Sequence, residues 1–252
     1  MAKTRTAGQG EAGGAAGALP PDGHRDAHEE KRAAILAATL AHVPFAGWSL
    51  AALQSGAEDC GYDRAEAQNA FPGGALEAIE HHSRLADARM LVAMEGADMS
   101  RMRVRERVAF AVRARLEGNA QNREAIRRAL VTLALPTNLG VSLACLYRTV
   151  DAIWHGAGDE SVDFNFYSKR GLLAGVYMAT LLHWLDDASE GQEASWRFLD
   201  RRIAEVLRVP RMVGELFKIF KGFPFPSKVG KPPFPAEGQG QNQGEKTWSE
   251  TK

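Results

Sequence analysis

Histidine and carboxylate side chains cluster in one stretch of the chain, and they are the first candidates for chemistry. His81 and His82 follow Glu77 and Glu80, and Glu77 and His81 stand one helical turn apart. Two of these groups could bind a metal ion, but a di-iron helical bundle needs Glu-x-x-His motifs on two helices, and the sequence has none. It also lacks a Gly-x-Ser-x-Gly motif, a P-loop and a dinucleotide fingerprint. We therefore expect no metal, no cofactor and no catalytic residue, and the chain is not predicted to be an enzyme.

Arginine is frequent over residues 101–115, and two interpretations of this segment remain open. One is a surface that binds phosphate groups or anionic lipid. The other is a solvated helix face, which Glu106 and Glu117 favour because they can pair with neighbouring cations. The arginines concerned are Arg101, Arg103, Arg105, Arg107, Arg113 and Arg115.

Composition excludes several classes of protein. The 252 residues carry 31 Lys and Arg against 31 Asp and Glu, so the basic excess of a general nucleic-acid binder is missing. Cys60 and Cys145 stand far apart with no secretory signal in view, which favours reduced thiols. The nearest candidate for a membrane span, 171–185, is shorter than the ~18–20 residues that span a bilayer. We interpret this run as a buried core helix.

Helical periodicity covers almost everything between two Gly- and Pro-rich ends, so we predict an all-α fold of about ten helices. Ser49 is a candidate N-cap, and so is Asp63, which has Glu66 three residues later. The expected parts are a disordered arm (1–25), a helix-turn-helix-like part (26–95), a second helical part (96–209), an amphipathic helix (210–221) and a disordered tail (222–252).

The first helical part has the layout of a helix-turn-helix and resembles the headpiece of TetR-type regulators. A transcription regulator with a hydrophobic effector is therefore one hypothesis. The expected recognition helix, residues 63–69, carries one cation against two anions, which is unfavourable for contacts with phosphates. We expect no specific DNA binding, and interpret the motif as a packing scaffold.

Residues 150–170 form a helix end, a glycine turn and a new helix with aromatic residues at the junction. The stretch from Ala157-Gly158-Asp159 to Lys169-Arg170 closely resembles the signature of the ubiquinone (coenzyme Q) biosynthesis accessory family. The resemblance continues through 172–185 and 196–202 and reaches back to Trp48-Ser49 and 71–74, so that it covers about residues 30–209. It implies a non-enzymatic lipid-binding protein with a TetR-like fold.

The resemblance also implies binding sites. The second helical part would enclose an isoprenoid or a phospholipid, with small residues on the 171–185 helix leaving room; close helix packing explains such residues equally well. A ubiquinone-pathway hydroxylase would bind at Asp151, Trp154 and His155, although the family often has Tyr at the last position. A homodimer is expected because the family and its regulator relatives often dimerise. The candidate lipid-binding residues are Val108, Val112, Leu143, Leu146, Val150, Leu172, Gly175, Val176, Ala179 and Leu182.

Residues 211–221 predict a short amphipathic helix. Phe217 and Phe220 fall on its apolar face, and Lys218 and Lys221 lie on the polar face and at the end. Such a helix can lie in the headgroup region of a membrane or dock on its own domain. The first alternative predicts a peripheral protein at the inner face of the bacterial inner membrane, or on the matrix side in mitochondria. There it would present a polyprenylated quinone precursor to the hydroxylase.

Overall fold

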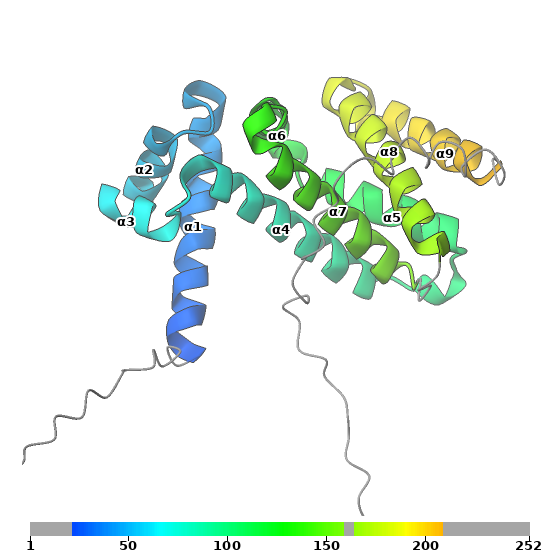
Figure 1. Ribbon diagram of the computed structural model, residues 1–252, viewed down its shortest axis with the longest axis horizontal. Helices are drawn as coiled ribbons and strands as arrows, with labels where there is room; N and C mark the ends of the chain where they lie inside the picture. Colours follow the sequence, from blue (N-terminus) through cyan, green and yellow to red (C-terminus); the bar gives the residue numbers. More distant parts are fainter. Residues whose placement is uncertain (1–21, 159–163, 209–252) are drawn as a thin grey trace, which may run out of the picture. The chain divides into compact units, whose positions relative to one another are not determined.

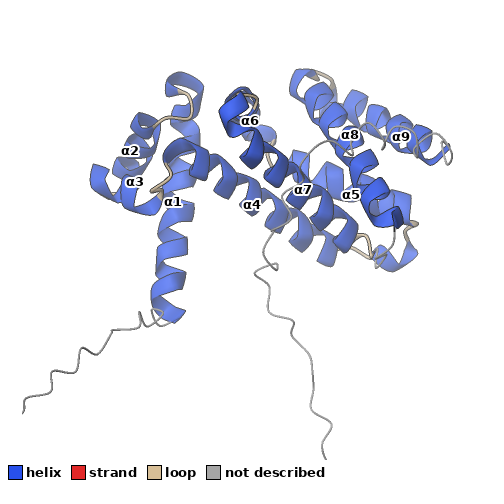
Figure 2. Ribbon diagram, in the orientation of Figure 1, coloured by secondary structure: helices blue, strands red, loops and turns tan. Residues whose placement is uncertain are grey.

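A computed structural model describes residues 22–158 and 164–208 of the chain. These residues form α-helices joined by short turns and 3-10 helices, with no strand among them, which confirms the predicted all-α fold (Figure 2). The segments predicted as an amphipathic helix (210–221, with Phe217, Lys218, Phe220 and Lys221) and as a tail (222–252) lie outside the described residues. The nine described α-helices are α1 (Asp22–Ala46), α2 (Leu50–Asp59), α3 (Arg64–Ala70), α4 (Gly74–Glu95), α5 (Val104–Glu117), α6 (Arg123–Leu133), α7 (Leu139–Gly156), α8 (Phe164–Asp186) and α9 (Glu193–Arg208).

The first helix begins earlier than the sequence pattern suggests. Residues 22–25, which we assigned to the disordered arm, already belong to α1. Residues 27–30 of α1 are exposed, and the apolar periodicity that marks the helix starts only near Ile35. Pro44 lies inside the last turn of α1 rather than ending it.

The first three helices and the start of α4 surround a small core of their own, which we call the headpiece (residues 22–78). Ile35, Leu53 and Phe71 are buried at its centre. Gly56 of α2 lies so close to α1 that a Cβ there would sit 2.7 Å from the backbone nitrogen of Thr39. Glycine is therefore the residue that lets these two helices approach.

The predicted N-caps of α2 and α3 are confirmed. The Ser49 side chain accepts a hydrogen bond from the backbone N–H of Ala52, and the Asp63 carboxylate accepts one from Glu66 at 3.0 Å. The side chain of Glu66 bonds to Lys31 of α1 instead of completing a capping box. Arg64, the one cation of α3, pairs with Glu58 of α2 at 2.6 Å.

The long helix α4 links the headpiece to a second and larger core (Figure 1). Its Ala78 belongs to the headpiece core, whereas Met90 and Met94 lie in the second one with residues of α5, α7, α8 and α9. A Cβ at Gly156 of α7 would lie 2.7 Å from the sulfur of Met94, so these helices also pack closely. Trp48 ties the two parts together, because its indole N–H donates to the Ala125 carbonyl of α6 at 2.8 Å.

No single helix within residues 22–158 and 164–208 is long and apolar enough to cross a membrane. In the same ranges, no three His, Cys, Asp or Glu side chains come together as metal ligands, and His81 and His82 are buried in α4. Cys60 and Cys145 are free thiols.

Candidate functional site

The second core, formed by α4, α5, α7, α8 and α9, contains part of the candidate lipid-binding set. Val108 and Val112 of α5, Val150 of α7 and Val176 of α8 are buried together in it, and Leu146 packs against them. Helical periodicity explains this grouping, since each of these residues lies on the apolar stripe of its helix. The structure therefore brings half of the predicted set to one place.

The remaining candidates lie toward the outside. Leu143, Leu172 and Ala179 are half-buried, and Gly175 and Leu182 are exposed on the outer side of α8. Leu182 keeps 55% of its surface exposed, and a Cβ at Gly175 would meet no described atom within 4 Å. The predicted single pocket is thus divided between the interior and the outer face of α8.

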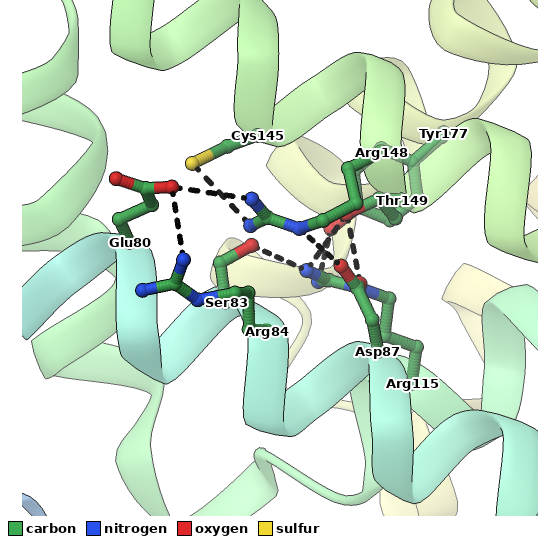
Figure 3. Close-up of polar contacts among 9 residues, drawn as sticks. All are labelled: Glu80, Ser83, Arg84, Asp87, Arg115, Cys145, Arg148, Thr149 and Tyr177. Carbon is green, nitrogen blue, oxygen red and sulfur yellow. Dashed lines mark hydrogen bonds and ion pairs between the residues drawn. The ribbon is translucent and has the colours of Figure 1, made fainter. Parts of the chain in front are cut away.

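A buried ion pair crosses the second core (Figure 3). The Arg115 guanidinium of α5 donates through Nε to Asp87 Oδ1 of α4 at 2.7 Å, and both side chains are less than a tenth exposed. Arg115 also donates to Ser83 and to the Tyr177 hydroxyl of α8. Thr149 of α7 accepts from Arg115 at 3.1 Å and donates to Asp87 at 2.8 Å. One guanidinium therefore connects four helices.

The ion pair continues toward the surface through a second arginine. Arg148 of α7 donates to Asp87 Oδ2 at 3.2 Å and lies 3.5 Å from Glu80, which also pairs with Arg84. Cys145 accepts a weak bond from Arg148. We call this set the polar network; Figure 3 shows all its members, which are Glu80, Ser83, Arg84, Asp87, Arg115, Cys145, Arg148, Thr149 and Tyr177.

Burial fixes the protonation states at the centre of the polar network. Burial raises the pKa of Tyr177, so its hydroxyl stays protonated at neutral pH. Burial alone would lower the pKa of Arg115, but Tyr177 and Asp87 favour the charged guanidinium and the net pKa is raised. Because the members bind one another, the polar network holds helices together rather than presenting a reactive group.

The predicted hydroxylase contacts lie on α7. The Asp151 carboxylate is half-exposed and accepts from Arg170 Nε of α8 at 2.7 Å. Trp154 is half-buried, its ring lies 5.7 Å from the Lys169 ammonium, and its indole N–H finds no acceptor in the described part of the chain. His155 is exposed. The structure therefore places these three side chains close together near the C-terminal end of α7.

A depression of about 310 Å³ lies between α5, the start of α9 and η4 (Glu190–Gln192). Arg113 covers the ring of Trp196 at 5.1 Å, and the Trp196 indole donates to the Gly191 carbonyl. Arg197, Glu193 and Asp200 complete the lining. Charges of both signs on the lining are unfavourable for a long apolar chain.

The fold has a solved counterpart. A TetR transcriptional regulator from Nitrosomonas europaea superposes with a TM-score of 0.60 at 20% identity, covering 71% of this chain and 99% of that one. At this identity the likeness shows the fold alone, and it confirms the TetR-like architecture.

Sequence comparison decides the family. The "Ubiquinone biosynthesis protein COQ9, mitochondrial" of Drosophila melanogaster is 32% identical over 219 residues, which are 84% of this chain and 67% of that protein. The chain belongs to the COQ9 family. The COQ9 family model matches residues 139–210, which include α7, α8 and α9. This result confirms the resemblance drawn from residues 150–170.

Other COQ9 relatives are similar over a smaller share of their length. The protein of the same name from Rattus norvegicus is 36% identical over 191 residues, 73% of this chain but 61% of the relative. The one from Bos taurus is 33% identical over 73% of this chain and 60% of its own length. The chain thus spans about three-fifths of the length of these relatives.

The polar network is the feature of this COQ9 family member that sequence reasoning missed. Arg115 fits neither interpretation of the arginines over 101–115, because it is buried in an ion pair. A signal was present, since Arg115 falls three residues after Val112 on the apolar stripe of α5. Asp87 likewise stands between buried Ala86 and Met90 in α4. A charge on a buried helical stripe requires a partner.

Proposed function

We propose that this COQ9 family member acts in ubiquinone biosynthesis as a lipid-binding accessory protein without enzymatic activity. It presents a polyprenylated quinone precursor to a hydroxylase at the membrane. The observation that carries the proposal is the similarity over 84% of the chain to a protein named for ubiquinone biosynthesis. Exposing each CH₂ of an isoprenoid to water costs about 0.8 kcal/mol, so a protein that shields the tail helps an enzyme to reach the ring.

The outer face of α8 supports the lipid-binding part of the proposal. Gly175 leaves open space there, and Leu182 and the half-buried Ala179 add apolar surface beside it. An isoprenoid or phospholipid chain lying along this face would cover Leu182, which otherwise exposes 55% of its surface. The buried valines of the second core then pack against the inner side of α8 and do not contact the lipid.

The end of α7 supports the partner part of the proposal. A buried indole N–H without an acceptor carries a desolvation penalty, and rotation of the half-buried Trp154 ring toward a carbonyl of a bound hydroxylase would remove it. Tryptophan is also enriched among residues that dominate binding at protein interfaces. Exposed His155 lies beside Trp154 and extends the same surface.

The cellular setting belongs to the same proposal. The relatives carry mitochondrial names, which supports the matrix side of the inner membrane for a eukaryotic member; in a bacterium the equivalent surface is the cytoplasmic face. The 211–221 segment would provide a membrane contact through Phe217 and Phe220, with Lys218 and Lys221 near anionic headgroups. A homodimer is the expected form.

Lipid extraction from the purified chain tests the proposal. Mass spectrometry should find a co-purified isoprenoid or phospholipid, and Gly175→Leu should reduce it severalfold because the new side chain fills the open space. Ala51→Leu is the matched control, since Ala51 is an exposed small residue on α2. An absence of bound lipid in the wild-type chain would contradict lipid binding. Equal amounts of bound lipid in Gly175→Leu and Ala51→Leu would show that the lipid does not bind on the outer face of α8.

A further inference from the structure

The turn between α6 and α7 carries exposed apolar side chains that the proposed function does not use. Val131 of α6 is 68% exposed, Leu135 is 51% exposed and Leu139 of α7 is 43% exposed. Ala134, Pro136 and Gly140 are exposed beside them. We call residues 131–140 the α6–α7 corner. Large apolar side chains grouped at one point of the surface mark a contact site.

The sequence around the corner contains no charged residue over a long stretch. From Ala129 to Tyr147 there is no Asp, Glu, Lys, Arg or His, and arginines stand on both sides at Arg127, Arg128 and Arg148. The helical segments before and after the corner bend by 95° at the break. The uncharged stretch is therefore sharply bent and does not form one straight helix.

Several polar groups of the α6–α7 corner bond to atoms of the corner or of the last turns of α6 just before it. Asn138 donates through its side-chain amide to the Thr132 carbonyl at 2.9 Å, and Thr132 Oγ1 donates to the Arg128 carbonyl at 3.1 Å. The backbone N–H groups of Ala134, Leu135 and Asn138 donate to carbonyls three or four residues earlier. Pro136 has no N–H to satisfy.

These local bonds favour one of two kinds of partner. A protein interface forms about one hydrogen bond per 100–200 Å² of buried area. The donors and acceptors for these bonds lie around an apolar centre. Hydrocarbon offers no hydrogen bonds, so a segment entering it must satisfy its own polar groups. The α6–α7 corner carries no charge, and the Asn138 amide and three backbone N–H groups are already bonded, so it comes closer to the second requirement.

The charged groups nearest the corner determine how strongly its binding to a membrane would depend on the charge of the lipid. Arg127 and Arg128 lie about one turn before Val131, and both pair with Glu124; Arg127 also pairs with Asp186. These carboxylates balance the two cations. Attraction to a membrane would then come from the apolar tip, with the long arginine side chains reaching the headgroups.

We propose that the α6–α7 corner inserts into the interfacial region of a lipid bilayer and places Val131, Leu135 and Leu139 among the acyl chains. This contact is separate from the 211–221 segment and from the lipid-binding face of α8. It does not depend on a bound isoprenoid or on the hydroxylase. The corner would fix the orientation of the second core at the membrane.

Site-specific fluorescence on the full chain tests the corner directly. Cys60 and Cys145 are replaced by Ala, and an environment-sensitive label is placed at Leu135→Cys or, as control, at Val92→Cys, an exposed apolar position on α4. With phosphatidylcholine vesicles, the label at 135 should shift to the blue and be quenched by brominated acyl chains. The label at 92 should do neither. A label at 135 that stays in water in the presence of vesicles overturns the proposal, including the case in which it is shielded only by added hydroxylase.

Vesicle flotation gives a second measurement. Leu135→Glu should lower binding to phosphatidylcholine vesicles more than tenfold, and Val92→Glu should leave it unchanged. Both positions are exposed, so thermal melts should match the wild type. Added phosphatidylglycerol should change the effect of Leu135→Glu little. Equal binding by the two variants contradicts the proposal. Absence of co-purified lipid from a wild-type chain that still binds vesicles would contradict only the proposed function.

Discussion

Asp87 and Arg115 form a buried ion pair that links α4 to α5, with 2.7 Å between Oδ1 and Nε. Removing one partner leaves a buried charge uncompensated, at a cost of about 3–5 kcal/mol. Asp87→Leu and Arg115→Met should each destabilise the chain by that amount in urea unfolding. The double variant should lose less than the sum.

Arg113→Met serves as the control for the ion pair. Arg113 lies two residues earlier on α5, pairs with exposed Glu117 and covers the Trp196 ring, which a methionine side chain can still contact. An exposed pair of this kind contributes about 0–1 kcal/mol. Strict additivity in the double variant, or an equal loss in Arg113→Met, would show that Asp87 and Arg115 are not energetically coupled.

His82 should make the stability of the fold depend on pH. Burial, with Arg89 and Arg115 nearby, lowers its pKa from 6.5 to about 4. The unfolded chain therefore takes up a proton near pH 6.5 that the folded chain does not accept until about pH 4. The free energy of unfolding that depends on neutral His82 is fully present above pH 6.5. It decreases as the pH drops toward 4, by about 3 kcal/mol in total.

The measurement for His82 is the urea midpoint against pH, compared between the wild type and His82→Leu. Carboxylates titrate in both proteins, so the difference between the two curves isolates the histidine. The two curves should diverge below pH 6.5. Parallel curves down to pH 4 would mean that His82 is accessible to protons in the folded chain.

Gly56→Ala should destabilise the headpiece. The new Cβ would lie 2.7 Å from the Thr39 nitrogen and 2.9 Å from the Ile35 carbonyl oxygen, so α1 and α2 would have to separate. Overpacking of this kind costs about 1–3 kcal/mol and exceeds the gain of alanine over glycine in a helix, about 1 kcal/mol.

Gly140→Ala is the matched change in α7, where a Cβ would meet no described atom within 4 Å. This variant should be neutral or more stable by up to about 1 kcal/mol. The measurement is the thermal unfolding of Gly56→Ala and Gly140→Ala. A Gly56→Ala variant that is more stable than the wild type would contradict the close approach of α1 and α2.

The elements of the fold could be predicted from the sequence, because local signals determine them. Ser49 and Asp63 cap the helices that follow them, and Gly118 and Pro136 stand where α5 and α6 have ended. These signals act within a few residues of the helix ends. They can therefore be recognised in the sequence without knowledge of the tertiary structure.

The interior of the second core could not be predicted in the same way. The pairing of Asp87 with Arg115 joins residues 28 apart, and the contact with Thr149 joins residues 62 apart. Helical periodicity marks Gly175 and Val176 as neighbours on one apolar helix, but only the packing of α8 shows that one is exposed and the other buried. Contacts between residues so far apart in the sequence leave no local pattern from which they could be predicted.

Trp154→Phe should weaken binding of the ubiquinone-pathway hydroxylase by about tenfold, because it removes the N–H and keeps an aromatic ring. The melting temperature should stay close to that of the wild type. This variant is a cleaner probe than Asp151→Lys, which would also break the contact with buried Arg170. Isothermal titration with the purified hydroxylase is the measurement, and Arg197→Ala on α9 is the control. Unchanged affinity in Trp154→Phe would exclude the indole N–H from the interface.

Deletion of the coding gene in the organism of origin tests the role in ubiquinone biosynthesis most directly. Quinone extraction followed by mass spectrometry should show a large fall in ubiquinone and accumulation of a polyprenylated precursor. Expression of the wild-type chain should restore ubiquinone, and Trp154→Ala should restore less. Normal ubiquinone content in the deletion strain would contradict the proposed role.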